Sequence, residues 1–390
     1  MSDSADDASA SRDDGMRLFW AGALSCMLVA ALGIVYPSAL EQFAQTVTST
    51  AFRAVGWFYL GSETAMLVLC LWLAFGRFGD VTLGKPDDEP EFSTASWLAM
   101  LFSAGMGSGL LFWGVAEPIT HFTHPPIGDP RTVEAAEFSM AATNFHWGLH
   151  AWAVYGIAAM VLAYFGFRYD APNLPGSPIR QTFSGKWVDP VARSADYIAV
   201  VAVALGVAAA LCMGTMQIHA GLRVAAGVPG ESMPITLGIL VAVVICYMLS
   251  AATSLDQGIK FLSNLNMALV VLVLLFILFA GSTGFILKTF FDSIGAYASE
   301  LVTMSFRSFP FRDVDGWFQD WTLTTLIWWI AWAPFVGVFI ARISRGRTIR
   351  EFVVGVLLVP TVFSIFWFAV FGGSAFDIEL NGAGGVSRLV

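Results

Sequence analysis

The stretch Ala104–Pro118 reads AGMGSGLLFWGVAEP and lies inside an otherwise apolar run of the chain. Glycines occupy three alternate positions in it, Gly105, Gly107 and Gly109. Glycine costs about 1 kcal/mol per site relative to alanine within a helix, and freed backbone groups at membrane depth are tolerated where they line a protein cavity. The same spacing also suits close packing of two helices. With GVAEP following it, the pattern favours a helix broken inside the membrane, as in many secondary transporters.

The composition places the whole chain in a membrane. Of its 390 residues 57% are hydrophobic and 13% are charged, whereas soluble domains carry about 25% charged residues. A membrane span needs about 20 apolar residues, and nine segments approach that length. The nine segments are Leu18–Tyr36, Val55–Phe75, Trp97–Val115, Ala141–Phe165, Tyr197–Ile218, Ile235–Leu249, Met267–Ile286, Leu323–Ile343 and Val353–Phe371. An all-α polytopic membrane protein is expected.

The two ends and the charges suggest a topology. Residues 1–16 are polar and acidic, which predicts a disordered cytoplasmic tail before a membrane domain at 17–390. Thirteen of the 20 Lys and Arg residues fall on one side when the N-terminus is placed inside, which favours that orientation and a cell inner membrane. No basic patch indicates nucleic-acid binding. The four cysteines all lie in predicted spans and are expected to be packing residues.

Aromatic side chains cluster on two of the predicted spans. The segment at 144–156 reads NFHWGLHAWAVYG, and on a continuous helix its Trp147, Trp152 and Tyr155 share one side. The segment at 327–337 reads IWWIAWAPFVG, and a further group of tryptophans shares one face there: Trp328, Trp329 and Trp332. Tryptophan also anchors helices at the membrane interface. Clustering near span centres favours instead an aromatic box for a quaternary ammonium ion.

Three further residues allow other interpretations. His146 and His150 stand four residues apart, a spacing that could bind a metal and that keeps a membrane metalloenzyme open as an alternative. No third ligand is apparent, because Glu117 and His121 follow the end of the predicted third span. Hydrogen-bonded structural histidines are the more common case, so no metal site and no enzyme activity are expected. Glu63 lies within the second span, where a carboxylate needs a partner or a cavity.

Several blocks together resemble the betaine/choline/carnitine transporter family. They occur in the order typical of that family and cover the chain from about Leu18 to its end. The blocks are LFSAGMGSGLLFWGVAEPITHF, NFHWGLHAWAVYG, KFLSNLNM, WWIAWAPFVGVFIARISRGRTIREF and FGGSA. The resemblance implies a LeuT-like core of two inverted repeats preceded by two extra N-terminal helices. It also implies alternating access, a homotrimer in membrane lipid, and a small quaternary-ammonium substrate.

The resemblance assigns roles to individual residues. It places Trp147, Trp152, Tyr155 and Trp329 in the central aromatic box, and Trp328 and Trp332 on the substrate path. Backbone amides around Ala104, Gly105, Met106 and Gly107 would bind a substrate carboxylate. Glycine at 109, where choline-type relatives tend to have an acidic residue, favours a zwitterion such as glycine betaine. No cofactor is expected. Sodium is the expected coupling ion, and its candidate ligands are the carbonyls of Ser103 and Met106, with Phe335 at a second site.

Two departures from the family leave alternatives open. Family members usually have twelve spans, so the chain is expected to lack the C-terminal ones, among them a helix expected to supply sodium ligands. The segment ALGVAAALCMG in the fifth span also lacks the hydroxyls that sodium-coupled relatives often carry. Sodium-independent exchange of carnitine or betaine, choline transport and a non-transporting fragment therefore remain alternatives to sodium-coupled import of glycine betaine.

Overall fold

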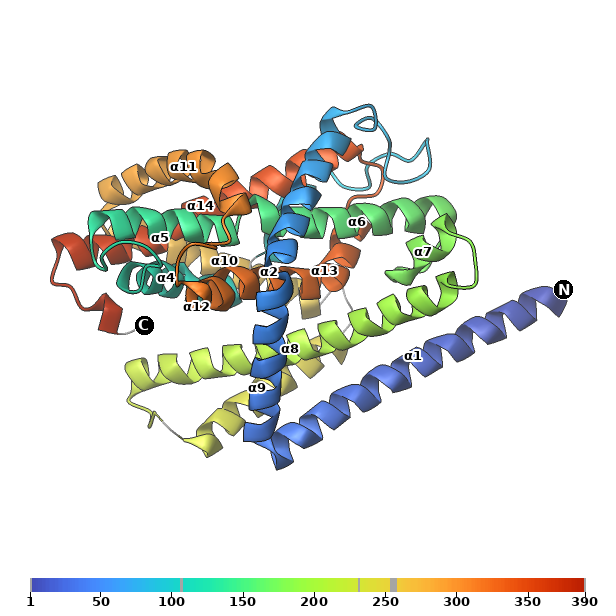
Figure 1. Cartoon of the computed structure of the whole chain (residues 1–390), viewed down its shortest axis with the longest axis horizontal. Helices are drawn as coiled ribbons and strands as arrows, with labels where there is room; N and C mark the ends of the chain where they lie inside the picture. Colours follow the sequence, from blue (N-terminus) through green and yellow to red (C-terminus); the bar gives the residue numbers. More distant parts are fainter. Residues whose placement is uncertain (1, 106–107, 231, 253–257, 389–390) are drawn as a thin grey trace. The chain divides into compact units, whose positions relative to one another are not determined.

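The structure is a computed structural model that describes residues 2–105, 108–230, 232–252 and 258–388 (Figure 1). All its regular elements are helices. The α-helices are α1 Ser2–Val35, α2 Pro37–Phe75, α3 Thr94–Gly105, α4 Ser108–Thr123, α5 Val133–His146, α6 Leu149–Tyr169, α7 Gly176–Thr182, α8 Val188–Ala226, α9 Met233–Ala252, α10 Gly258–Ala280, α11 Thr283–Phe306, α12 Asp315–Trp317, α13 Thr324–Ile343 and α14 Ile349–Asn381. A π-helix η1 spans Phe318–Leu323, and a short 3-10 helix η2 spans Val386–Arg388.

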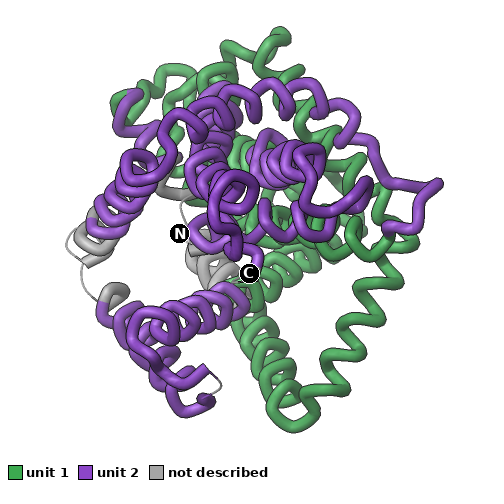
Figure 2. The backbone as a smooth tube through the Cα atoms, turned by 90° about the vertical axis from the view of Figure 1, so that its left-hand side faces the viewer, with its two compact units in different colours: residues 1–93, 153–207, 315–353 green, residues 94–152, 208–314, 354–390 purple. Residues whose placement is uncertain are grey.

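The helices form two compact units that interleave along the chain (Figure 2). Unit 1 comprises residues 1–93, 153–207 and 315–353, and unit 2 comprises residues 94–152, 208–314 and 354–390. The chain therefore passes from one unit to the other within helices such as α6 and α8. Each unit is assembled from segments that are far apart in the sequence.

Among the described residues, six helical segments are long and apolar enough to cross a membrane, and a bent pair raises the number to seven. Six of the nine predicted spans correspond to these segments, and the prediction for Met267–Ile286 corresponds to the bent pair. That prediction is wrong in its C-terminal part, because α10 ends at Ala280 and α11 begins at Thr283 after a bend of 111°. Two predicted spans are not among these segments. Trp97–Val115 is covered by the described parts of α3 and α4, and Ile235–Leu249 belongs to an apolar helix that is too short.

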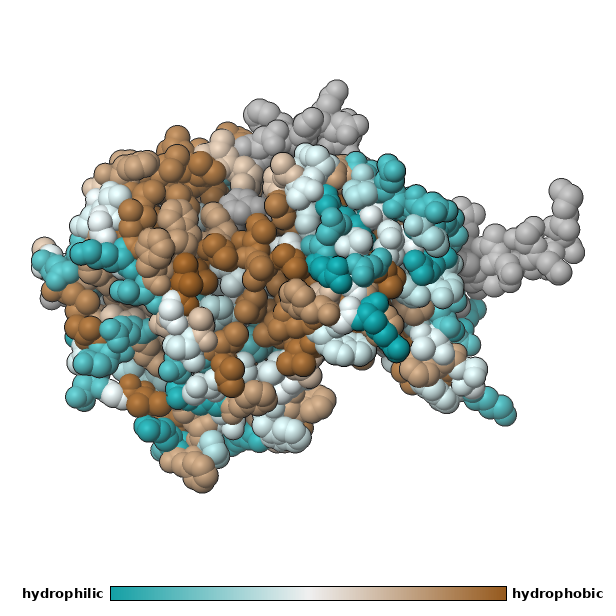
Figure 3. Space-filling model, turned by 90° about the horizontal axis from the view of Figure 1, so that it is seen from above, coloured by the Kyte–Doolittle hydropathy of each residue, from teal (hydrophilic) through white to brown (hydrophobic). Residues whose placement is uncertain are grey.

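The surface is consistent with a lipid environment. Figure 3 shows apolar side chains gathered over a broad area of one face, next to a separate hydrophilic area. On α1 and α2, large apolar residues such as Leu28, Trp57 and Phe75 are exposed. In water such a surface would cost free energy in proportion to its apolar area. The first helix runs from Ser2, so the structure continues α1 through the acidic residues for which composition predicts a disordered tail.

A set of contacts that we call the loop clasp joins two loops of unit 1. The loop after α2 contacts the loop between α13 and α14 through a bridge between Thr82 and Thr348, the one isolated β-bridge in the described part of the chain. Backbone hydrogen bonds from Leu83 N to Arg347 O and from Gly346 N to Leu83 O measure 2.8 and 2.9 Å. Three arginine–carboxylate pairs surround them: Arg345–Asp88, Arg342–Glu91 and Arg350–Asp80.

Candidate functional site

The glycine motif lies at the junction between the described parts of α3 and α4. Helix α3 is described as far as Gly105 and α4 from Ser108. Met106 and Gly107, where the sequence predicts the break, lie outside the described residues. Ser103 and Ala104 belong to the last turn of α3. The break in this helix therefore stays a prediction.

The aromatic segment at 144–156 is an interrupted helix, which corrects the prediction of one continuous face. Helix α5 ends at His146, Trp147 is its C-cap residue with φ −109° and ψ 7°, and α6 begins at Leu149. The prediction that Trp147 shares one side of a continuous helix with Trp152 and Tyr155 is therefore wrong. Trp152 and Tyr155 do share α6, and both are almost fully buried.

Gly148 and Tyr297 explain the interruption. A methyl group at Gly148 would lie 2.4 Å from both the Asn144 carbonyl oxygen and the Tyr297 hydroxyl, so only glycine fits here. The amide of Leu149, at the start of α6, donates a hydrogen bond of 2.8 Å to that hydroxyl. Tyr297 belongs to α11. In the structure Tyr297 is buried and stabilises the break between α5 and α6.

Within unit 2, the indole of Trp147 contacts α4. Its Nε1 donates a hydrogen bond of 2.7 Å to Oε2 of Glu117. At the opposite end of the ring, Cη2 lies 3.7 Å from the position that a methyl group at Gly109 would take. A methyl group at Gly109 would thus meet this end of the Trp147 ring at an ordinary van der Waals distance. Trp147 is half-buried.

The remaining aromatic residues of the predicted site form two pairs in unit 1. Tyr155 meets Trp329 edge to face, with ring centroids 5.5 Å apart. Trp328 and Trp332 stack with centroids 6.3 Å apart, as their spacing on one helix face predicts. A methyl group at Gly206 of α8 would lie 3.2 Å from Nε1 of Trp332. The lack of a side chain at Gly206, within ALGVAAALCMG, therefore leaves room for the Trp332 ring.

Phe335, the candidate for a second ion site, is the most exposed of the predicted site residues with a described side chain. It contacts Trp332 at 5.8 Å between ring centroids and is 55% exposed. Trp147, Trp152 and Gly109 belong to unit 2, whereas Tyr155, Phe335 and the tryptophans of α13 belong to unit 1.

The two histidines considered as a metal pair are separated. His150 Nε2 lies 3.1 Å from the Ser305 hydroxyl and contacts Phe145. His146 instead joins Glu117 and His121, and one ligand atom from each lies within 4.8 Å of the others. Sequence reasoning missed this cluster because it placed Glu117 and His121 beyond a span. The four-residue spacing of Glu117 and His121 was the available signal, since it puts both on one face of α4.

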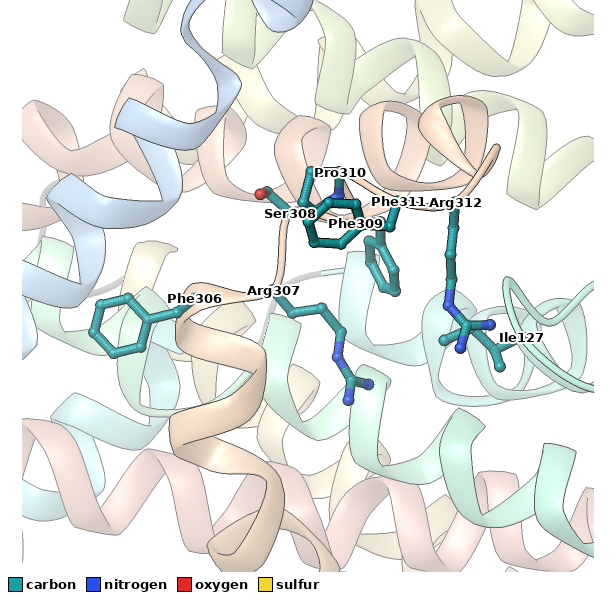
Figure 4. A pocket seen from close by; sticks show the side chains of 8 residues that line it. All are labelled: Ile127, Phe306, Arg307, Ser308, Phe309, Pro310, Phe311 and Arg312. Atoms are coloured by element: carbon teal, nitrogen blue, oxygen red, sulfur yellow. The ribbon is translucent and has the colours of Figure 1, made fainter.

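Two other polar features lie apart from these clusters. Glu63 is fully buried in α2, and its carboxylate oxygens make no hydrogen bond within the described part of the chain. In unit 2 a pocket of about 210 Å³ lies at the loop after α11, where the rings of Phe309 and Phe311 lie between the side chains of Arg307 and Arg312 in the view of Figure 4. In Figure 4 the Arg312 side chain reaches toward Ile127. No predicted site residue lines this pocket.

Comparison with known proteins assigns the chain to a family. A family model described as betaine/carnitine/choline family transporter matches residues 17–390. The chain belongs to this family. Its members are transporters, so the chain is grouped with transporters and not with enzymes.

Three curated relatives are similar over most of the chain. It is 44% identical to the glycine betaine transporter OpuD of Bacillus subtilis over 92% of this chain and 70% of that protein. It is 39% identical to a probable glycine betaine transporter of Desulfitobacterium hafniense, over 92% and 71%. It is 41% identical to the high-affinity choline transport protein of Escherichia coli K12, over 85% of this chain and 49% of that protein.

Proposed function

We propose that this chain is a secondary transporter that imports glycine betaine or a related quaternary-ammonium osmolyte by alternating access. The observation that carries the proposal is the perpendicular pair of Tyr155 and Trp329, with ring planes at 87°. Two ring faces at a right angle present two walls of a box, and a desolvated quaternary ammonium gains about 2 kcal/mol from such faces. The resemblance to the family also assigns Trp147 and Trp152 to the box, and Trp328 and Trp332 to the substrate path.

The substrate carboxylate would bind at the break that the glycine motif predicts. Backbone amides around Ala104, Gly105, Met106 and Gly107 would donate to it. A break in a helix favours an anion through its free amides and through the helix dipole. Glycine at 109 adds no negative charge to this region, which suits a zwitterion better than a net cation.

The coupling ion in this proposal is sodium. The carbonyls of Ser103 and Met106 would contribute ligands, and Phe335 would border a second site. The segment ALGVAAALCMG within α8 brings no hydroxyl oxygen, while a hard cation such as sodium needs oxygen ligands. Sodium-independent exchange is therefore the competing mechanism. The setting we propose is the inner membrane, with the N-terminus inside and three copies per assembly.

Fluorescence of the tryptophans tests this function. Glycine betaine is titrated into the purified chain in sodium buffer and then in potassium buffer. Saturable quenching in sodium alone supports the sodium-coupled importer. Equal affinity in both salts contradicts sodium coupling and favours the exchanger. Choline and carnitine are titrated alongside, and a tighter fit for either would replace glycine betaine as the substrate. Absence of a response to all three compounds contradicts the proposal.

A further inference from the structure

Glu117 is a buried carboxylate with three nitrogen-bearing rings around it. It is 2% exposed and lies on α4. Its Oε1 lies 2.6 Å from His146 Nδ1 and 3.5 Å from His121 Nε2. Its Oε2 accepts the 2.7 Å hydrogen bond from Trp147. A carboxylate with so little exposure needs such donors to retain its charge.

A metal ion is a possible occupant of this cluster, since one carboxylate and two imidazoles form a set of ligands that zinc accepts. The geometry favours hydrogen bonds instead. Two ligand atoms on one tetrahedral zinc are about 3.3 Å apart when each lies about 2.0–2.1 Å from the ion. The 2.6 Å between His146 Nδ1 and Glu117 Oε1 is a hydrogen-bond distance. The second carboxylate oxygen is engaged by Trp147.

The hydrogen bond from Trp147 to Glu117 has a consequence for the ring. A charge-assisted hydrogen bond is stronger than a neutral one, and it draws the indole N–H proton toward the anion. Electron density on the ring rises as a result, and with it the attraction of the ring face for a cation. The hydrogen bond also fixes the direction in which the N–H edge of the ring points. The anion thus both polarises and orients the ring.

We propose that Glu117 is a specificity-determining residue that acts through Trp147. Its carboxylate orients the indole and strengthens its attraction for a positively charged ammonium, so that a quaternary ammonium is selected over an uncharged group of the same shape. This inference rests on the proposed function, because it requires that Trp147 contacts the substrate.

The test compares glycine betaine with 3,3-dimethylbutanoate, in which a carbon replaces the ammonium nitrogen and the shape is retained. The ratio of the two dissociation constants is measured for the wild type and for Glu117→Gln. We expect the preference for glycine betaine to fall about tenfold, because hydrogen bonds to charged groups contribute about 1.5–3 kcal/mol. If Glu117 had a purely structural role, its replacement would weaken the binding of both ligands equally and leave the ratio of their dissociation constants unchanged.

A second variant separates the contribution of Trp147. Trp147→Phe keeps an aromatic face and removes the N–H donor, so we expect it to lower the same ratio with Glu117 intact. In the double variant, Glu117→Gln is expected to add no further loss, since both changes break one interaction. Should Glu117→Gln fail to fold, the Trp147→Phe ratio decides the question, and an unchanged ratio there overturns the inference.

The outcomes distinguish this inference from the function on which it rests. The wild type could bind glycine betaine while Glu117→Gln leaves the ratio of the two dissociation constants unchanged. That result overturns the inference and leaves the proposed function standing. A wild type that binds no quaternary ammonium overturns both. Metal analysis of the purified protein completes the test, because stoichiometric zinc in the wild type that is lost in Glu117→Gln would overturn the role of Glu117 as a hydrogen-bond acceptor for Trp147.

Discussion

Tyr155 on α6 and Trp329 on α13 meet edge to face, at 5.5 Å between ring centroids and 87° between ring planes. Edge-to-face pairs of this kind contribute about 0.5–1.5 kcal/mol beyond the area that they bury. The pair keeps both side chains in place before any ligand arrives.

Trp329→Leu is expected to weaken glycine betaine binding severely, by about 30-fold or more. The change removes a cation–π contact of about 2 kcal/mol and leaves Tyr155 without its aromatic neighbour. Isothermal titration of the purified variant measures the effect. Trp57→Leu serves as the control, since Trp57 is 65% exposed on α2. Near-unchanged affinity in Trp329→Leu would reject the assignment of this residue to the box.

Gly109→Asp is expected to shift the preference from glycine betaine toward choline, because an added carboxylate attracts a net cation and repels the substrate carboxylate. The structure accommodates the change: a methyl group would lie 3.7 Å from Trp147 and 3.8 Å from Trp113, which is ordinary contact. Competition of choline against labelled glycine betaine measures the order of affinity. Gly109→Asn, which adds a similar volume without charge, should keep the original order. The same order in both variants would contradict the role given to charge at this position.

Gly346→Ala is expected to destabilise unit 1 by opening the loop clasp. Gly346 has a φ of +80°, and a methyl group there would lie 2.2 Å from the backbone of Glu89. Both conditions favour glycine, and strain of this kind costs about 1–3 kcal/mol. Thermal unfolding in detergent measures the change. Gly61→Ala in α2, where no atom lies within 4 Å of an added methyl group, is the control and should unfold at the wild-type temperature or slightly higher.

The loop clasp should weaken in acid. The hydrogen bond from Arg345 holds the pKa of Asp88 below its usual value, and the Lys85 amide adds to the effect. A carboxyl whose pKa is lowered by folding contributes stability above its unfolded pKa of about 3.9, and this stability is lost as the pH falls through the folded value. Unfolding temperatures of the wild type and Asp88→Asn between pH 7 and pH 3 test this. The unfolding temperatures of the two proteins should converge as the pH falls toward 3. A constant difference between them would contradict a stabilising pair of Asp88 and Arg345.

The sequence predicts a helix break at 105–108, because alternating glycines are costly inside a continuous helix, and this stays a prediction because Met106 and Gly107 lie outside the described residues. The sequence does not predict the interruption at Trp147, since that break depends on Tyr297, a residue about 150 positions away. The same limit applies to Glu117 and His146, which come together only once α4 packs against α5. The pairing of Trp328 with Trp332 follows from spacing on one helix and is confirmed, whereas the partner of Trp329 lies on a different helix and needed the structure.

The loop clasp also bears on how the chain is made. Asp88 and Arg345 are 257 residues apart, and ribosomes add about 5–20 residues per second. The loop after α2 therefore emerges on the order of tens of seconds before its partner exists. During that interval its carboxylates and backbone groups are exposed to water, chaperones and proteases. The clasp closes only after Arg345 has been made, so changes in it should reduce the yield of assembled protein as well as its stability.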